Sequence, residues 1–539
     1  MLMRVASLPV FSSMSRLMAV IIGVAMIFAA APQAQAQVTE FRQAVAEAAA
    51  ADEDLVAFYR ARNFEGIWST RADRARRNAL LAAFTAAGDH GLPAAEYDPQ
   101  ALMAQLQAAQ TPQAQGRLEV ALSRLFLQYA RDVQTGILVP SRVDNNIKRQ
   151  VPYRGRLSTI QAFAQSSPAA FLRSLPPASP EYTRLMRQKM TLEQTLADGG
   201  WGATVPGNKL ERGQSGPAVV ALRNRLIAKG FLGRTNTQTY DDAITAAVQR
   251  FQAAHGLAID GTAGPGTLSE INRGPEDRLQ AVIVAMERER WINRPRGERH
   301  IWVNLTDFTA KIIDNDTVTF ETRSVIGAKQ DDRVSPEFSD VMEFMVINPS
   351  WYVPRSIVTK EFLPQLQRNP NAVSQLEITD RSGRRVNRGA VDFSQYNAST
   401  FPFSMRQPPS RGNALGLVKF MFPNRYNIYL HDTPAKSLFG REVRAFSHGC
   451  IRLNDPFDFA HELLSKQVGN PAEFFQAKLR TGREQRVDLA APVPVHLVYR
   501  TAFTQADGQM QYRRDVYGRD ARIWNALARE GVAIRAVRG

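Results

Sequence analysis

Apolar positions change their spacing near residue 300, and this change divides the chain into two kinds of segment. Before it, apolar residues recur with a period close to 3.6, for example between residues 118 and 127, which predicts amphipathic helices. After it, apolar and other residues alternate, as in Ile301–Leu305, which is typical of half-buried strands. The pattern predicts a multidomain α+β protein that is helical in its first half and mainly β in its second.

The first half contains two helical regions, and Gly199, Gly200 and Gly207 mark the boundary between them. The N-terminal region is rich in alanine, and its predicted helices are Glu40–Arg62, Ala72–Ala87, Arg117–Gln134 and Glu181–Leu196. The second region, residues 210–272, is a compact unit with helices after Gly216, from about Asp241 and after Gly264. One further helix is predicted over Pro275–Ile292.

Strands dominate the second half. They are predicted from His300, and over Lys311–Asp314, Thr317–Thr322, Val341–Ile347, Tyr426–Leu430, Pro494–Phe503 and Gln509–Arg513, with helices over Phe457–Ser465 and Asp520–Glu530. The polar stretch at about residues 353–413 is too long for a simple loop in a compact sheet. We expect it to form an inserted subdomain or lid.

Composition and charge narrow the class of protein. A chain of 539 residues predicts about three domains at ~150 residues each. Cys450 is the single cysteine, which excludes an internal disulfide and any Cys₄ or Cys₂His₂ zinc site. The 67 Lys and Arg against 51 Asp and Glu give a net charge of +16, which favours anionic partners.

The N-terminal segment predicts export. Arg4 and Arg16 precede an apolar run from Leu17 to Ala31, and Ala34-Gln35-Ala36 follows as a small-x-small pattern. This is typical of a signal peptide cleaved after Ala36, and the run is shorter than the ~20 residues of a membrane span. An uncleaved membrane anchor is the alternative. An exported basic protein does not meet chromosomal DNA, so we expect a periplasmic protein without a nucleic-acid partner.

Reactive side chains are densest in the run SHGCIR, from Ser447 to Arg452, with His431 upstream of it. A cysteine nucleophile needs a basic imidazole in reach, an acceptor that orients the imidazole, and donors for the developing oxyanion. Gly449 permits a tight turn, so the amides of Gly449 and Cys450 are candidate oxyanion donors. Arg452 adds a cation that favours the thiolate and can pair with a substrate carboxylate. We therefore expect a depressed pKa for Cys450.

A lone cysteine is more often a small buried hydrophobe than a nucleophile. Here the neighbours of Cys450 are polar or glycine, and two of the seven histidines of the chain belong to the cluster. A free thiol in an exported protein is also open to oxidation, so a use for it is expected.

Residues 210–272 resemble the peptidoglycan-binding domain of bacterial wall enzymes. The resemblance rests on Gly216 and Gly230, the run AVQRFQ at 247–252, and the pairs His255-Gly256 and Asp260-Gly261. It implies a unit that holds an enzyme on the wall, although the motif defines no individual binding residues.

The spacing of His431 and Cys450 resembles the signature of the L,D-transpeptidases with a YkuD-type catalytic domain. The runs YLHDTP at 429–434 and FSHGCIRL at 446–453 carry this resemblance, and NPSW at 348–351 and LGLVKF at 415–420 fit it. The order of signal, helical scaffold, peptidoglycan-binding module and catalytic domain with insert resembles the large YcbB-type members.

The resemblance implies a role for each residue of the cluster. Cys450 corresponds to the nucleophile and His431 to the general base, with Asp432 orienting His431 through its carbonyl or through its side chain. The flanking positions correspond to those that shape the pocket and the oxyanion site: Ser447, His448, Gly449 and Arg452. Tyr429 corresponds to an aromatic position that lines the cleft.

The implied reaction is the formation of 3→3 peptidoglycan crosslinks through a cysteinyl thioester on tetrapeptide stems, with release of D-Ala. No metal or organic cofactor is implied. The implied partners are stem peptides as donor and acceptor, further envelope proteins, and carbapenems as covalent inhibitors. The expected domains are a signal peptide (1–36), helical scaffold (37–208), peptidoglycan-binding domain (209–273), linking helix (274–298), catalytic domain (299–485, insert about 353–413) and C-terminal strands and helix (486–539).

Other functions stay open at this point. The same fold can attach a lipoprotein lysine to the wall, or hydrolyse stems with water as acceptor. A zinc hydrolase would use His431, His448 and Cys450 with Asp432 or His461, although His461 is better interpreted as a surface residue of the helix that Pro456 starts. A wall-binding protein without turnover is the last alternative.

Overall fold

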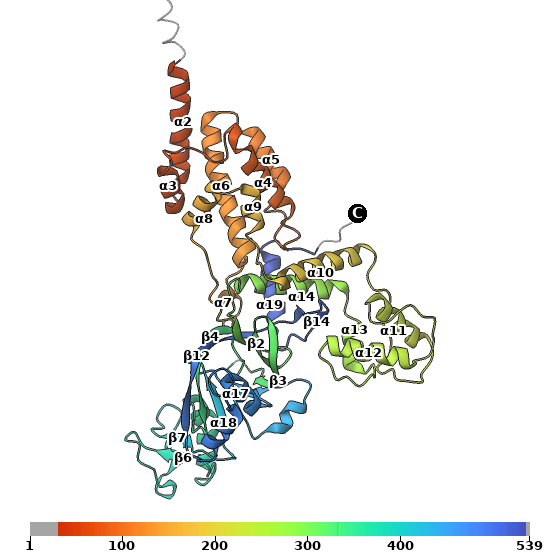
Figure 1. Ribbon diagram of the computed structural model, residues 1–539, viewed down its shortest axis with the longest axis vertical. Coiled ribbons are helices and arrows are strands. Elements are labelled where there is room, and N and C mark those ends of the chain that lie inside the picture. The colour runs from red at the N-terminus through yellow and green to blue at the C-terminus, as the bar shows by residue number, and fades with distance from the viewer. Residues whose placement is uncertain (1–30, 331, 535–539) are drawn as a thin grey trace, which may run out of the picture. The chain divides into compact units, whose positions relative to one another are not determined.

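The computed structural model describes residues 31–330 and 332–534 (Figure 1). The chain forms two compact units, the first made of Met1–Ile137 and Tyr153–Pro177, the second of Leu138–Pro152 and Ala178–Gly539. Within the described ranges, no helix has both the length and the apolar character that crossing a membrane requires. The predicted signal peptide lies outside the described residues for positions 1–30, and its cleavage pattern at 34–36 falls within the first described helix, α2.

The first unit is helical, as its apolar spacing predicted. Its elements are α2 (Ala31–Ala49), α3 (Glu53–Arg60), η1 (Arg71–Asp73), α4 (Arg74–Thr85), α5 (Pro99–Ala108), α6 (Pro112–Thr135), α8 (Arg156–Gln165) and α9 (Pro168–Arg173). The single helix predicted over Glu40–Arg62 was wrong, because the chain breaks at Asp52. The Asp52 carboxylate accepts from the Leu55 amide at 3.3 Å and so begins α3 as a separate helix.

Aromatic side chains fill the centre of the first unit. The Trp68 and Phe163 rings stack with centroids 5.2 Å apart, and Phe126 stacks on Phe163 at 4.2 Å. The buried Glu119 carboxylate accepts from the amides of Ile67 at 2.7 Å and Trp68 at 3.0 Å, which fixes the chain beside this core. These large side chains are therefore core anchors.

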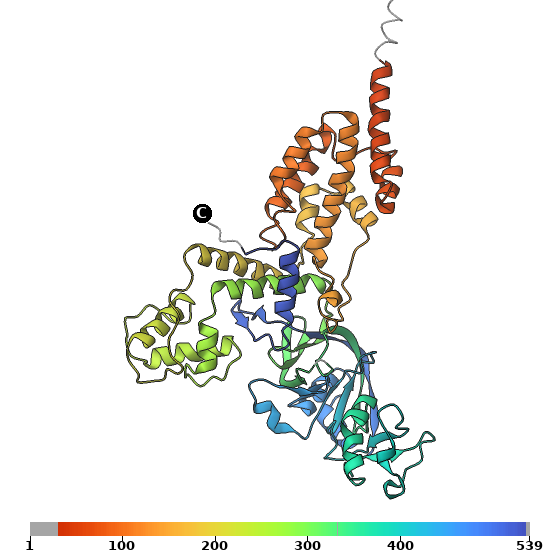
Figure 2. The ribbon, with the colours of Figure 1, turned by 180° about the vertical axis from the view of Figure 1, so that it is seen from behind.

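Several helices of the second unit precede its main sheet along the chain. They are α7 (Pro140–Val143), α10 (Pro180–Ala197), α11 (Pro217–Ala228), α12 (Asp242–Ala254), α13 (Pro265–Ile271) and α14 (Pro275–Trp291). Helices α10 and α14 run side by side in both views (Figures 1 and 2). Helices α11–α13 share a core of their own around Leu222, Val248 and Phe251, which confirms the predicted three-helix module.

A nine-stranded mixed sheet forms the β-rich part of the second unit. Its strands are β1 (Arg299–Asn304), β2 (Thr309–Asp314), β3 (Thr317–Gly327), β4 (Phe338–Ile347), β8 (Val418–Met421), β9 (Leu430–His431), β10 (Ala445–Ser447), β11 (Ile451–Leu453) and β12 (Gln485–Val498). Their order is β10-β3-β11-β9-β8-β4-β12-β1-β2, and β2 also pairs with β3. This extra pairing closes the sheet into a barrel, and apolar side chains pack inside it and under α17 (Pro456–Leu464) and α18 (Pro471–Leu479).

Two predicted strands differ from the observed ones. The strand expected over Tyr426–Leu430 is wrong for its first residues, because the Asn424 side chain holds this segment as a turn. Its Oδ1 accepts from the amides of Tyr426 and Ile428 at 3.0 and 3.2 Å. The strand expected over Pro494–Phe503 is two strands, the end of β12 and β13 (Ala502–Thr504), and β13 pairs with β14 (Met510–Tyr512) ahead of α19 (Arg519–Arg529).

The insert folds as a small subdomain. It contains β5 (Trp351–Tyr352), α15 (Arg355–Ile357), the π-helix η2 (Val358–Phe362), α16 (Leu363–Arg368), β6 (Glu377–Thr379), η3 (Arg388–Ala390), η4 (Phe393–Gln395) and β7 (Ser404–Gln407). Strands β5, β7 and β6 form a separate sheet, and Leu366, Ile378 and Phe393 belong to a separate apolar core. The boundaries drawn from sequence for this insert and for the other domains stay predictions.

Candidate active site

Neighbouring strands carry His431 and Cys450 to one end of the barrel sheet. Strands β9 and β11 run parallel, with Ile451 opposite Leu430 and Arg452 opposite His431. This register places Cys450, which precedes β11, beside Tyr429, whose carbonyl accepts from the Ile451 amide at 3.1 Å. Residues 15 or more positions apart in sequence therefore meet because of strand pairing.

His431 is buried, and a main-chain carbonyl holds its ring. Its Nδ1 lies 2.5 Å from the Asp432 carbonyl, the atom that the family resemblance assigns as one possible orienting acceptor. The Asp432 carboxylate has other partners, the amides of Leu417 at 2.9 Å and Thr433 at 2.7 Å and the Lys436 ammonium at 2.9 Å. An acceptor at Nδ1 favours the tautomer that leaves Nε2 as the basic nitrogen.

The Cys450 thiol contacts groups other than His431. Its Sγ lies 3.5 Å from the Asn427 carbonyl, to which it donates, and the amide and hydroxyl of Tyr429 both face the sulfur. Among the residues that the structure describes, no hydrogen bond joins Cys450 to His431. The Tyr429 ring lies edge-on to the His431 ring, with the two centroids 5.6 Å apart. Because the thiol donates to the Asn427 carbonyl, it must turn towards His431 before its proton can pass to the imidazole.

The ionisation of the two groups contradicts the expected depressed pKa of Cys450. Burial raises the pKa of the Cys450 thiol to about 11, and this outweighs the opposing effects of Tyr429 and the Arg452 cation. Burial, with a smaller contribution from Arg452, lowers the pKa of His431 to about 3. The resting pair is therefore a neutral thiol and a neutral imidazole, and not a thiolate–imidazolium ion pair.

The amides near Cys450 also differ from the expected pattern. The Gly449 amide donates to Ser447 Oγ at 3.1 Å, and that hydroxyl donates to the Cys450 carbonyl at 2.5 Å. In this conformation the Gly449 amide is therefore not free to donate to an oxyanion, whereas the sequence had predicted that the amides of Gly449 and Cys450 donate together. The Cys450 amide donates to no acceptor within the described chain. Gly449 has a φ of +108°, which only glycine adopts readily, so the turn itself requires this residue.

Arg452 is a half-buried cation beside the thiol. Its Nε is buried and has no hydrogen-bond partner among the described residues. The guanidinium lowers the pKa of both Cys450 and His431, which locates its charge near both groups. An unpaired guanidinium at a reactive thiol suits a carboxylate-bearing ligand.

His448 points to the insert. Its Nε2 lies 2.6 Å from Glu361 Oε1, and the same carboxylate accepts from Arg333 at 2.8 Å. Glu361 lies in the π-helix η2, an irregularity that recurs at functional sites. Sequence reasoning missed Glu361, Arg333 and Asn427, because no motif or spacing marks them.

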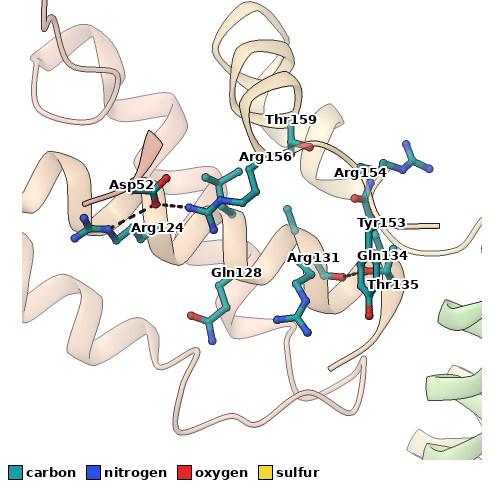
Figure 3. A pocket seen from close by; sticks show the side chains of 12 residues that line it. Asp52, Arg124, Gln128, Arg131, Gln134, Thr135, Tyr153, Arg154, Arg156 and Thr159 are labelled. Atoms are coloured by element: carbon teal, nitrogen blue, oxygen red, sulfur yellow. Dashed lines mark hydrogen bonds and ion pairs between the residues drawn. The ribbon is translucent and has the colours of Figure 1, made fainter. Parts of the chain in front are cut away.

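The described residues give little support for a metal site or for a second catalytic site in the first unit. No cluster of three or more His, Cys, Asp and Glu side chains suited to a metal occurs in the described ranges, and His461 Nδ1 lies 3.7 Å from Asp458 on the same helix. A cavity of about 470 Å³ in the first unit is lined by basic and amide side chains, among them Arg124, Arg131 and Arg156 (Figure 3). Arg156 is engaged there by the Asp52 carboxylate, and the lining contains no nucleophile of the cysteine type.

Comparisons with known proteins agree with this geometry. A family model described as "L,D-transpeptidase catalytic domain" matches residues 298–477, which include His431 and Cys450. A model described as "Putative peptidoglycan binding domain" matches residues 215–271, and one described as "Scaffold domain" matches residues 53–188.

Two curated proteins share parts of the sequence. A Haemophilus influenzae protein named "Putative L,D-transpeptidase" is 29% identical over 246 residues, 44% of this chain and 48% of that protein. The zinc D-Ala-D-Ala carboxypeptidase of Streptomyces albus G is 45% identical over 78 residues, 14% of this chain and 29% of that enzyme. The chain thus spans about half or less of the length of these relatives.

A solved structure gives a weaker likeness. The L,D-transpeptidase of Xylanimonas cellulosilytica is 14% identical, with 54% of this chain and 98% of that chain covered and a TM-score of 0.17. The likeness of this chain to known proteins lies in the three matched domains and in the motif residues that they contain. The chain carries an L,D-transpeptidase catalytic domain of the YkuD type together with a peptidoglycan-binding domain and a scaffold domain, the combination of YcbB-type proteins.

Proposed function

We propose that this protein forms 3→3 crosslinks between peptidoglycan stems through a thioester on Cys450, with release of D-Ala. One observation carries the proposal: a lone thiol and a neutral imidazole held by a carbonyl lie at the ends of adjacent parallel strands, inside the matched catalytic domain. Each partner has the protonation state that a stepwise acyl transfer needs at its start.

Acylation begins with the neutral pair. The Cys450 thiol turns from the Asn427 carbonyl, passes its proton to His431 Nε2, and attacks the carbonyl between diaminopimelate and the terminal D-Ala. The carbonyl oxygen gains negative charge, and the Cys450 amide is available to donate to it. Collapse of this tetrahedral intermediate breaks the C–N bond, D-Ala leaves with the proton from His431, and a thioester remains on Cys450.

Deacylation repeats the same transfers with a second stem. The side-chain amine of that stem attacks the thioester, His431 takes its proton, and the sulfur leaves as the C–S bond breaks. The thiolate recovers the proton from His431, so the cycle closes with no net change in the enzyme. Burial of the His431 imidazole also limits access of water, which would otherwise hydrolyse the thioester.

Substrate recognition would use the unpaired Arg452 and the insert. Arg452 is suited to a carboxylate of the donor stem, since its Nε has no partner among the described residues. The Glu361–His448 contact would hold the insert over the thioester as a lid. The matched peptidoglycan-binding domain would keep the catalytic domain on the wall, and residues 1–36 would direct export to the periplasm.

Mass spectrometry of muropeptides, after incubation with purified tetrapeptide stems, tests the proposal. Wild-type protein should yield free D-Ala and a 3→3 dimer, while Cys450→Ala should yield neither, since the chain has no other thiol. Free tripeptide without dimer would identify a hydrolase. Dimer formed by Cys450→Ala would refute the cysteine mechanism, and a product seen only with an added lysine-bearing lipoprotein peptide would make the protein a tether of that lipoprotein.

A further inference from the structure

A second cavity, of about 330 Å³, lies in the second unit beside the turn that precedes β9. Four basic side chains line it, Lys148, Arg149, Arg294 and Arg425, whereas Asp340 is its one acidic lining residue. The cavity therefore has an excess of positive charge, and none of the motif residues around Cys450 lines it.

The cations of this cavity have no carboxylate partners among the described residues. Arg149 donates to Ser339 Oγ at 2.6 Å and to the Leu497 carbonyl, both neutral groups. Lys148 Nζ donates to the Asn145 side-chain oxygen at 2.8 Å. Cations that are partly removed from water and not neutralised by the protein favour a bound anion.

Burial, with smaller contributions from the neighbouring Arg288, Arg294 and Arg500, lowers the pKa of Arg149 to about 10, while Glu337 opposes this shift. Glu337 is itself engaged by Arg288 at 2.5 Å and by Arg519 at 3.1 Å, so little of its charge is left for the cavity. Asp340 therefore stays as the one acidic side chain of the lining, against four basic ones, and the charge balance of the cavity is positive.

The wall of the cavity is continuous with the turn that contacts the nucleophile. Arg425 and Tyr426 line the cavity, and the next residue, Asn427, accepts from the Cys450 thiol at 3.5 Å. Asn424 makes the turn stiff, because its Nδ2 donates to the carbonyls of Phe422 at 2.6 Å and Ile428 at 2.8 Å. Arg425 and Asn427 therefore belong to one braced turn.

We propose that this cavity binds a compact oxyanion, a carboxylate or a phosphate, and that its occupancy frees the Cys450 thiol through Asn427. An anion between Arg294 and Arg425 draws Arg425 and its turn towards the cavity. The Asn427 carbonyl then withdraws from Sγ, and the thiol is released to turn towards His431. Under the proposed function, the natural source of such a carboxylate is a second stem peptide; the binding itself does not depend on that function.

The test follows the rate at which the neutral reagent 4,4′-dithiodipyridine reacts with Cys450 in the full-length protein. Added inorganic phosphate, at ionic strength matched with chloride, should raise this rate at least twofold in a saturable way. The increase should be lost in Arg425→Gln and Arg294→Gln, two exposed positions, and kept in Arg480→Gln, an exposed arginine outside the cavity. No saturable increase, or an equal increase in Arg425→Gln, would overturn the proposal.

Calorimetry separates the source of the anion from the proposed crosslinking activity. In Cys450→Ser/Arg452→Gln protein, which lacks the nucleophile and its neighbouring cation, phosphate and a tetrapeptide stem are titrated separately and in competition. A stem that binds more tightly than phosphate and competes with it identifies the carboxylate source, and phosphate binding alone identifies a phosphate ligand. Absence of both in this variant and in wild type refutes the site, whatever the muropeptide assay shows.

Discussion

The resting ionisation of Cys450 offers the sharpest test of the catalytic geometry. A thiol pKa of about 11 leaves ~10⁻⁴ of the protein as thiolate at pH 7, against ~3 × 10⁻² for an ordinary thiol with a pKa of ~8.5. The more basic thiolate is intrinsically more nucleophilic, with a Brønsted slope of ~0.4–0.5, which recovers a factor of ~10–20. Cys450 should therefore react with a neutral disulfide ~20-fold more slowly in the folded protein than in urea.

The single cysteine makes this measurement unambiguous, because all of the signal from 4,4′-dithiodipyridine comes from Cys450. Between pH 7 and 10 the rate should rise about tenfold per unit, as expected for a thiol that ionises near 11. Arg452→Gln should slow the reaction further, since the Arg452 cation lowers the thiol pKa. His431→Gln should leave this rate nearly unchanged while abolishing crosslinking, because no hydrogen bond joins the two side chains in the described structure. A fast rate that is flat from pH 5 to 8 and falls in His431→Gln would establish an ion pair and refute this reasoning.

Contacts elsewhere in the chain can be tested in the same way. Burial lowers the pKa of His496 to about 3, below the ordinary ~6.5. The contribution of neutral His496 to the free energy of unfolding is therefore fully present above pH ~6.5, and it falls by about 1.4 kcal/mol per pH unit as the pH drops towards 3. Thermal melts of His496→Gln should show a smaller loss of stability over this acid range. Glu361→Gln keeps the shape of the side chain but removes the negative charge that faces His448. This variant should raise the ratio of hydrolysed to crosslinked product several-fold in the muropeptide assay. An unchanged ratio would mean that the contact does not hold the insert over the thioester. Gly416 has a φ of +62°, and a Cβ added there would lie 2.3 Å from Asp432 Cγ. Gly416→Ala should therefore lower the free energy of unfolding by about 1–3 kcal/mol, measured by denaturant titration, and reduce the rate of D-Ala release. Intact-mass spectrometry should find one carbapenem on the wild type, none on Cys450→Ala and a slower gain on Arg452→Ala; labelling of Cys450→Ala would point to a serine nucleophile.

Local patterns of residues were enough to predict the class of fold and the residues of the motif. Helical spacing before residue 300 and alternation after it are local properties, and both survive in the structure because each element buries the face that its pattern marks. The tight turn at Gly449 of the SHGC run was also predicted, and the φ of +108° observed there is one that few other residues adopt. Cys450 was recognisable because the chain has no other cysteine.

The tertiary structure decided how these residues ionise and what they contact. The raised pKa of Cys450 depends on burial by segments far away in sequence, whereas the cation at Arg452, visible in the motif, suggested the opposite direction. Strand register sets the thiol beside Tyr429, and the turn braced by Asn424 brings the Asn427 carbonyl to it. Glu361 reaches His448 across 87 positions of sequence, which no local pattern encodes. Burial, register and long-range contact are properties of the folded chain, so the chemistry of the pair could be named from sequence but its resting state could not.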